Sequence, residues 1–188
     1  MMSAMRVGIA DHFGWAVAVT ANDRHEVVDR RRIELIEPGM HSAPVHHGIE
    51  GLDDAAAAAF VADARASAAR ATAAALDELG ADLRQPVASI SLRVWPEDFP
   101  QDIAVQRQVP WEARADGIMY RQVLAEVAAA RGWPVCGYVA KDVLDLAAAQ
   151  LGARADEVLV GPKAALGPPW TKDHRVALAA TVMAGVTG

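Results

Sequence analysis

The sequence has little of what marks a disulfide-rich, zinc-binding or membrane protein. A single cysteine, Cys136, among 188 residues excludes a disulfide framework and a cysteine-based zinc site. It lies in the apolar run 135–139, where we expect a buried, unreactive thiol. No apolar run approaches the ~20 residues that a membrane-spanning helix needs. Residues 1–6 also lack the basic and apolar regions of a secretion signal, so we expect a cytoplasmic protein without a membrane partner.

Positive charge is also scarce. The chain has 18 Lys and Arg against 24 Asp and Glu, which gives a formal net charge of −6. Dedicated nucleic-acid binders usually present a basic face, because the neutralisation of phosphates supplies most of their affinity. The acidic balance therefore argues against a tight, general nucleic-acid binder, although a local patch or a metal ion can still contact nucleic acid.

The length and the apolar content are those of a single folded domain, residues 1–188. At ~150 residues per domain, 188 residues correspond to one domain. The hydrophobic fraction is 53%, but much of it is alanine, which contributes little burial per residue. The core must therefore come from the Val, Leu, Ile and Trp positions.

The first half of the chain predicts three strands, a helix and a fourth strand. Short apolar runs over 6–10, 15–20 and 27–36 are separated by turn residues, which is typical of antiparallel strands. After a loop over 37–51, Asp53 and Asp54 begin an alanine-rich helix that runs to about Leu79. In the next strand, 87–95, the side formed by Ala88, Ile90, Leu92 and Val94 is uniformly apolar, and we expect it to pack on the core.

The second half alternates helices and strands. The irregular stretch 96–110 is a candidate lid or binding loop. Apolar spacing predicts a helix over 111–131, a strand over 135–140 and a helix over 141–151. The segment 157–161 fits either a short strand or a helix end, and Thr171 caps a last helix over 172–184. This order predicts an α/β fold: a mixed five-stranded sheet, its first three strands antiparallel, flanked by helices.

Three segments resemble RuvC-type Holliday junction resolvases of the ribonuclease H-like superfamily. They are Ala-Arg-Ala-Asp-Gly at 113–117, Pro-Val-Cys-Gly-Tyr-Val-Ala-Lys at 134–141 and Lys-Asp-His-Arg-Val-Ala-Leu-Ala at 172–179. They are similar to that family's helix entry, its Pro-Val-x-x-Tyr-x-Ala strand followed by a basic residue, and its closing helix. The similarity in layout covers roughly residues 6–184, so the resemblance implies a ribonuclease H-like fold.

The resemblance also implies hydrolysis of a phosphodiester by two Mg²⁺ or Mn²⁺ ions, held by carboxylates from the first strand, the fourth strand and the last helix. The first-strand acid falls at or beside Asp11. The fourth-strand acid falls near Ser91 and Arg93, neither of which is a carboxylate. The last helix offers Asp173, whereas its second acid is replaced by Val176.

The resemblance therefore marks a partial set of site residues. The catalytic candidates are Asp11, Asp173 and His174, and the candidate metal ligands are Asp11, Glu97, Asp98, Asp116 and Asp173. Each acid also has a plain structural interpretation: a turn-forming residue at the end of a strand, a first-turn acid that complements the helix dipole, or a solvated loop acid.

Basic and histidine residues supply weaker signals. Residues 30–32 form the only basic run, and on a strand they can meet phosphate or simply protect a sheet edge. The candidate nucleic-acid contacts are Arg30, Arg32, Arg93 and Lys172. The loop histidines His41, His46 and His47 fit a transition metal only weakly, because they lack cysteine partners and helical spacing.

Two functions remain open at this point. One is a divergent, metal-dependent nuclease that acts on nucleic-acid phosphodiesters. The other is a catalytically inactive ribonuclease H-like domain that serves as a binding or assembly module, with alanine-rich faces available for a homo-oligomer. The missing carboxylates and the acidic balance favour the second, but the first is the more specific hypothesis, and we take the nuclease as the expected function with the inactive module as the alternative.

Overall fold

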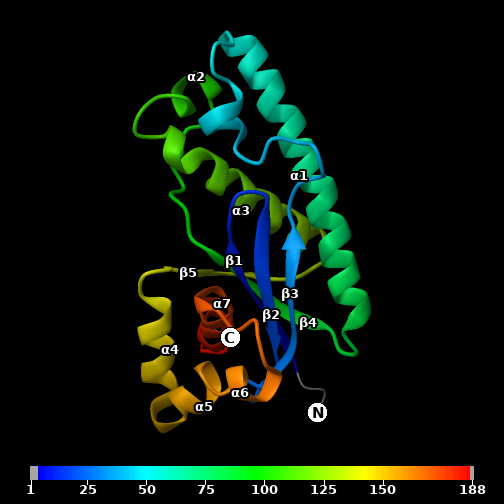
Figure 1. Ribbon diagram of the computed structural model, residues 1–188, viewed down its shortest axis with the longest axis vertical. Helices are drawn as coiled ribbons and strands as arrows, with labels where there is room; N and C mark the ends of the chain where they lie inside the picture. Colours follow the sequence, from blue (N-terminus) through cyan, green and yellow to red (C-terminus); the bar gives the residue numbers. More distant parts are fainter. Residues whose placement is uncertain (1–3, 187–188) are drawn as a thin grey trace.

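The centre of the molecule is a twisted five-stranded sheet in the order β3-β2-β1-β4-β5 (Figure 1). The computed structural model describes residues 4–186. Hairpins join the first three strands antiparallel, whereas β4 and β5 run parallel to β1 and are reached through helices. The predicted mixed sheet is therefore confirmed. The strands are β1 Met5–Asp11, β2 Trp15–Ala21, β3 Val27–Glu34, β4 Val87–Arg93 and β5 Val135–Tyr138.

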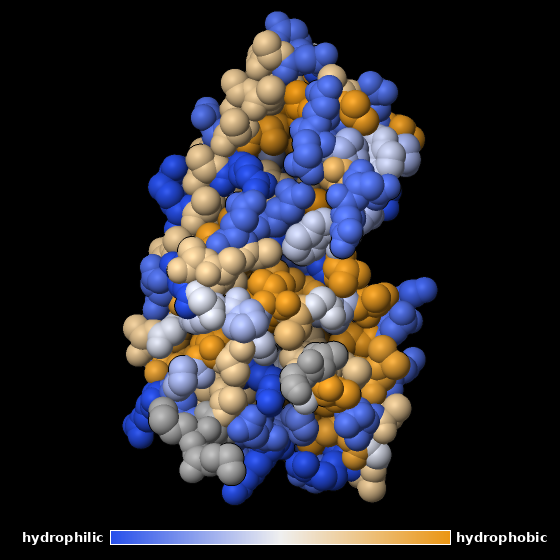
Figure 2. Space-filling model, turned by 180° about the vertical axis from the view of Figure 1, so that it is seen from behind, coloured by the Kyte–Doolittle hydropathy of each residue, from blue (hydrophilic) through white to orange (hydrophobic). Residues whose placement is uncertain are grey.

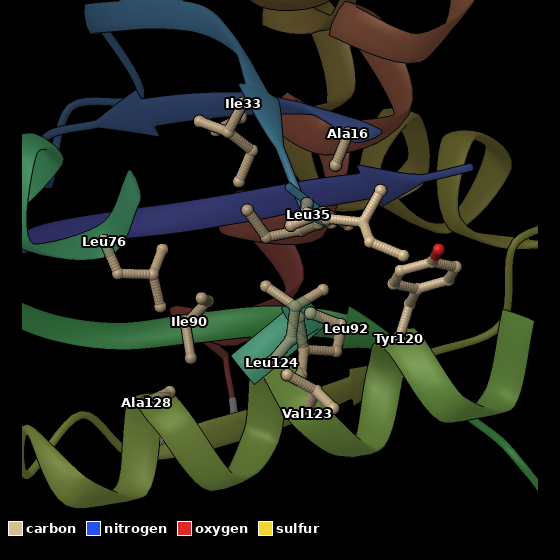
Figure 3. Close-up of a cluster of buried hydrophobic side chains, with 14 of the residues drawn as sticks. Ala16, Ile33, Leu35, Leu76, Ile90, Leu92, Tyr120, Val123, Leu124 and Ala128 are labelled. Atoms are coloured by element: carbon tan, nitrogen blue, oxygen red, sulfur yellow. The ribbon is translucent and has the colours of Figure 1, made fainter. Parts of the chain in front are cut away.

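Helices cover both faces of this sheet. The longer ones are α1 Asp54–Asp82, α3 Glu112–Ala130, α4 Val143–Leu151 and α7 Lys172–Ala184. The short ones are η1 Pro44–Gly48, α2 Ile103–Gln106, η2 Gly152–Arg154, α5 Ala155–Leu159 and α6 Pro162–Leu166. One core cluster joins the sheet to α1 and α3 through residues such as Leu35, Leu76 and Leu124 (Figure 3). A second joins the opposite face to α7 and α4.

The helix α7 packs unusually close to the middle of the sheet. A Cβ atom at Gly8 of β1 would collide with the backbone carbonyl of Ala177, so only glycine fits there. On the neighbouring strand, the Ser91 hydroxyl donates a hydrogen bond to the Ala180 carbonyl at 3.2 Å. Small residues on both strands therefore let the helix backbone approach the sheet.

The prediction for β4 was wrong in part because both faces of the sheet are covered. Ile90 and Leu92 lie in the core as predicted, but Ala88 and Val94 are exposed. The opposite, polar side is buried as well, with Ser89 and Ser91 packed under α7. In a sheet with helices on both sides, alternation of polarity along a central strand does not identify a solvent face.

Several segments predicted as irregular are short helices. The loop 37–51 contains η1, and the stretch 96–110 contains α2, whose first turn is capped by the Asp102 carboxylate accepting from the Ala104 amide at 2.9 Å. The undecided segment 157–161 is mostly helical, and α1 continues past Leu79 to Asp82. Cys136 is half-buried rather than buried, because β5 is the edge of the sheet. Within residues 4–186, no helix is long and apolar enough to cross a membrane.

Candidate functional site

The three places from which the resemblance draws acidic ligands meet at one end of the sheet. Asp11 is the last residue of β1, and Arg93 is the last residue of the adjacent parallel strand β4. The carboxyl ends of parallel neighbours lie at the same edge. The start of α7, with Asp173, reaches the same edge through His12, and α3 contributes Arg121. The fold thus brings the expected positions together, but with a different set of side chains.

Asp11 lies between two guanidinium groups. Its side chain is only 3% exposed, and its Oδ2 accepts a hydrogen bond from Arg121 Nε at 2.8 Å. Its Oδ1 lies 3.7 Å from Arg93 Nε, an ion pair that is too long for a hydrogen bond. Neither of those two atoms has a hydrogen-bond partner among the described residues. The buried Asp11 carboxylate is therefore already neutralised by protein cations.

Tyr138 lies next to the cluster formed by Asp11, Arg93 and Arg121. Its hydroxyl donates a hydrogen bond to the Ile9 carbonyl at 2.6 Å. Burial, followed by the charge of Asp11, raises the pKa of Tyr138 to about 12, so the phenol stays neutral near pH 7. The neutral Tyr138 side chain therefore offers no negative charge to a cation.

Asp173 pairs with a histidine that sequence reasoning did not single out. Its Oδ2 lies 3.0 Å from His12 Nε2, and both side chains are more than a third exposed. The His12 ring stacks on Trp15 with 4.1 Å between ring centroids, and the Arg32 guanidinium lies 4.0 Å from the same indole. The acid predicted as a metal ligand is therefore engaged at the rim of the cluster.

His174 belongs to the cap of α7 and not to the cluster around Asp11. Its Nδ1 accepts from the Thr171 amide at 3.2 Å and lies 2.9 Å from the Thr171 hydroxyl. Its ring is buried against Trp170, and burial, followed by the charge of Arg30, lowers the pKa of His174 below its usual range. The structure thus gives this histidine a helix-capping environment.

The other predicted acids have different surroundings. Asp116 is fully buried rather than a solvated first-turn acid, and its carboxylate accepts from the amides of Val45 and His46 at 2.9 and 3.0 Å. It therefore holds η1 against α3, and burial raises its pKa. Glu97 and Asp98 are exposed in the turn that follows β4.

The predicted nucleic-acid contacts are largely engaged within the chain. The Arg30 guanidinium donates to the carbonyls of Leu166, Gly167 and Pro169 and so fixes the segment between α6 and α7. Arg32 pairs with Glu34 in addition to its contact with Trp15, and Arg93 faces Asp11. Lys172, at the start of α7, is exposed.

These residues do not fit a two-metal centre. Such a centre needs several converging oxygen ligands with negative charge. Across residues 4–186, no group of three or more His, Cys, Asp or Glu side chains is arranged to hold a metal ion. That finding includes the histidine loop, although the rings of His46 and His47 are 4.1 Å apart.

Arg121 and His12 are the two site residues that the sequence did not reveal. Arg121 lies 110 positions from Asp11, in the middle of an amphipathic helix, where a lone arginine is ordinary. His12 follows Asp11 directly, and this adjacency could have marked it as a candidate site residue. Its partner, Asp173, is 161 positions away.

Comparison with solved structures supports the fold. A structure of Thermus thermophilus RuvC aligns with a TM-score of 0.54 at 12% identity, over 97% of this chain and 94% of that chain. A second structure, T. thermophilus RuvC in complex with a Holliday junction substrate, gives 0.53 at 12% identity, over 98% and 94% of the two chains. No protein-family model matches the sequence, and no curated protein matches it either. The chain therefore has the ribonuclease H-like fold of the RuvC resolvases.

Proposed function

We propose that the chain is a catalytically inactive ribonuclease H-like domain that serves as a binding or assembly module. One observation carries the proposal: Asp11, at the position of the first-strand acid, is buried and paired with Arg121, while Arg93 stands where the fourth-strand acid belongs. Two fixed positive charges thus flank the carboxylate that a metal ion would need.

Electrostatics explains why this arrangement opposes metal binding. A divalent cation at Asp11 would stand beside two guanidinium groups, and like charges at such short range repel strongly where water is scarce. To make room, Arg121 would have to leave Asp11, yet its side chain is only 15% exposed. An unpaired, largely buried guanidinium costs several kcal/mol. We therefore propose that Asp11 stays paired with Arg121 and binds no metal ion.

Nucleic acid is poorly supported as the partner of this module. A RuvC structure with a Holliday junction substrate shares the fold, but this chain has a net charge of −6 and uses Arg30 and Arg32 in internal contacts. Phosphate contacts need free cations, because counterion release supplies most of the affinity. We therefore expect binding to a four-way DNA junction to be weak at physiological salt.

A cleavage assay tests the proposal. The substrates are labelled single-stranded, duplex and four-way-junction DNA with Mg²⁺ or Mn²⁺, and the proteins are the wild type, Asp173→Asn and the control Asp156→Asn, an exposed acid on α5. We expect no cleavage above the buffer rate from any of the three. Metal-dependent cleavage by the wild type and by Asp156→Asn that is lost in Asp173→Asn would overturn the proposal and restore the nuclease interpretation.

A further inference from the structure

A cavity in the upper half of the molecule is separate from the cluster around Asp11. It has a volume of about 500 Å³ and lies between α1, α3 and the segment 96–110, which contains α2 (Figure 1). Neither Asp11 nor its partners Arg93 and Arg121 line it. Sites that hold small molecules have volumes of about 300–1,000 Å³, so the cavity is large enough for one. The sequence predicts a lid or binding loop over the same segment, and that segment supplies one wall.

Part of the cavity lining is apolar. Val61 comes from α1, Phe99 and Ile103 come from the segment 96–110, and Ile118 comes from α3. Figure 2 shows hydrophobic residues in the upper half of the molecule, between the alanine-rich surface of α1 and a group of hydrophilic residues. Small-molecule sites combine an apolar lining of this kind with a few polar groups that orient the ligand.

The segment 96–110 adds hydrogen-bond acceptors to this lining. Gln101 and Gln106 donate through Nε2 to backbone carbonyls at 3.0 and 2.6 Å, and neither Oε1 atom has a donor among the described residues. One oxygen of Asp102 accepts from the Ala104 amide at 2.9 Å, whereas its other oxygen has no donor within residues 4–186. A ligand that enters the cavity therefore finds unmatched acceptors on one wall.

The charges at the cavity favour a cation over an anion. Among the described lining residues, Asp102 is the only acid and Arg65 the only base. The Arg65 guanidinium is already engaged, because it donates to Glu126 at 2.6 Å and to Gln122 at 3.3 Å. Asp102 has no ion-pair partner in the described part of the chain. The net charge of −6 also attracts cations from a longer distance.

We infer that this cavity binds a small amine, in which an ammonium group is attached to a compact apolar body. An ammonium group has three N–H donors, and the unmatched oxygens of Gln101, Asp102 and Gln106 are its acceptors. The apolar body covers Val61 and Ile118, which removes apolar surface from water. The side chain of a lysine from another protein fits less well, because its flexible stem loses more conformational entropy and fills less of the apolar part.

The wall that carries the acceptors is held in place by the protein itself. Arg107, directly after α2, donates to the carbonyls of Ile49 and Leu52 at 3.1 and 2.9 Å. It also pairs with Asp54, at the start of α1, at 3.0 Å. A wall that is ordered before the ligand binds lowers the entropic cost of binding. The cavity can therefore bind a ligand with few atoms.

Titration of the full chain with phenethylamine, followed by NMR, tests the inference. We expect saturable binding with a dissociation constant on the order of 1 mM, because the probe has few atoms. Three comparison probes each change one property. Phenethyl alcohol lacks the charge, hydrocinnamate reverses it, and Nα-acetyl-lysine amide replaces the compact apolar body with a lysine stem. Each should bind about fivefold more weakly or less.

Two substitutions assign the binding to this cavity. Asp102→Asn removes the charge and keeps a side chain that can cap α2, and Ala62→Phe fills the cavity from an exposed position of its lining. The matched controls are Asp156→Asn on α5 and Ala81→Phe on α1, both at exposed positions outside the lining. The dissociation constant for phenethylamine should rise roughly fivefold or more in each cavity variant and stay unchanged in the controls. Thermal unfolding verifies that each variant is folded.

Three results would overturn the inference. They are the absence of saturable binding to the wild type, a dissociation constant that either cavity variant leaves unchanged, and binding of Nα-acetyl-lysine amide as tight as that of phenethylamine. The last result would assign the cavity to a side chain of another protein rather than to a free amine. The cavity and the inactive site at Asp11 can fail separately, because this titration measures neither metal binding nor cleavage.

Discussion

Replacing Asp11 with asparagine removes the negative charge that lies between Arg121 and Arg93. Asparagine keeps the shape of the side chain and can still accept one hydrogen bond from Arg121 Nε, so the change isolates the effect of charge. Loss of this charge leaves the guanidinium groups of Arg121 and Arg93 facing one another across a neutral amide. The variant should therefore be less stable than the wild type.

The magnitude follows from burial. Breaking a buried ion pair by removing one partner costs about 3–5 kcal/mol. Here the acid is 3% exposed and Arg121 15%, but Arg93 is 35% exposed and its charge is partly solvated. We therefore expect a loss of about 2–3 kcal/mol in the free energy of unfolding. For a chain of 188 residues, this lowers the melting temperature by roughly 4–12 °C.

Urea unfolding of Asp11→Asn, with Asp98→Asn as the matched control, measures this loss. Asp98 is an exposed acid beyond β4, and its replacement should change stability by less than about 0.5 kcal/mol. A carboxylate within a cluster of metal-binding acids behaves in the opposite way, because removing one like charge relieves repulsion. An Asp11→Asn protein as stable as the wild type, or more stable, would refute the ion-pair account.

Three further predictions concern the stability of the fold. Gly8→Ala should lower stability by more than about 3 kcal/mol in urea unfolding, because its Cβ would meet the Ala177 carbonyl, and a smaller loss would mean that α7 can shift. Asp116→Ala should lower the free energy of unfolding by about 2 kcal/mol, because two η1 amides lose their acceptor. Proteolysis within η1 should also become faster, and an unchanged cleavage rate would contradict this. Hydrogen bonds from Arg70 are the main cause that lowers the pKa of Glu37 to about 2 from 4.5, so this pair stabilises the fold above pH 4.5 and loses its effect as the pH falls toward 2. The difference in melting temperature between the wild type and Glu37→Gln should shrink over that range, and a constant difference would contradict the assignment.

The architecture was accessible from the sequence because local signals agree with the global fold. The turn at residues 12–14 and the turn after Ala21 define the hairpins, and Asp53 caps α1 by accepting from the Ala56 amide at 2.8 Å, as predicted. The short helices were missed because tertiary contacts stabilise them. For example, η1 depends on the Asp116 carboxylate, more than 65 positions away.

The site was less accessible because its partners are distant in sequence. The sequence identified Asp11 and Asp173 as residues of interest and identified the gap at Arg93. It did not indicate that Arg121 would pair with Asp11, because a charged residue on a helix surface has no periodic signature that distinguishes a buried ion pair from a solvated side chain. Only the packing of α3 against the sheet turns Arg121 toward β1.

Titration of the folded protein with Mn²⁺ by calorimetry tests the central claim most directly. The account predicts no saturable binding to the wild type, and the same flat titration for Asp173→Asn, because two guanidinium groups already neutralise the Asp11 carboxylate. Stoichiometric binding of Mn²⁺ that Asp173→Asn abolishes would contradict it, since the carboxylates at this end of the sheet would then form a metal site.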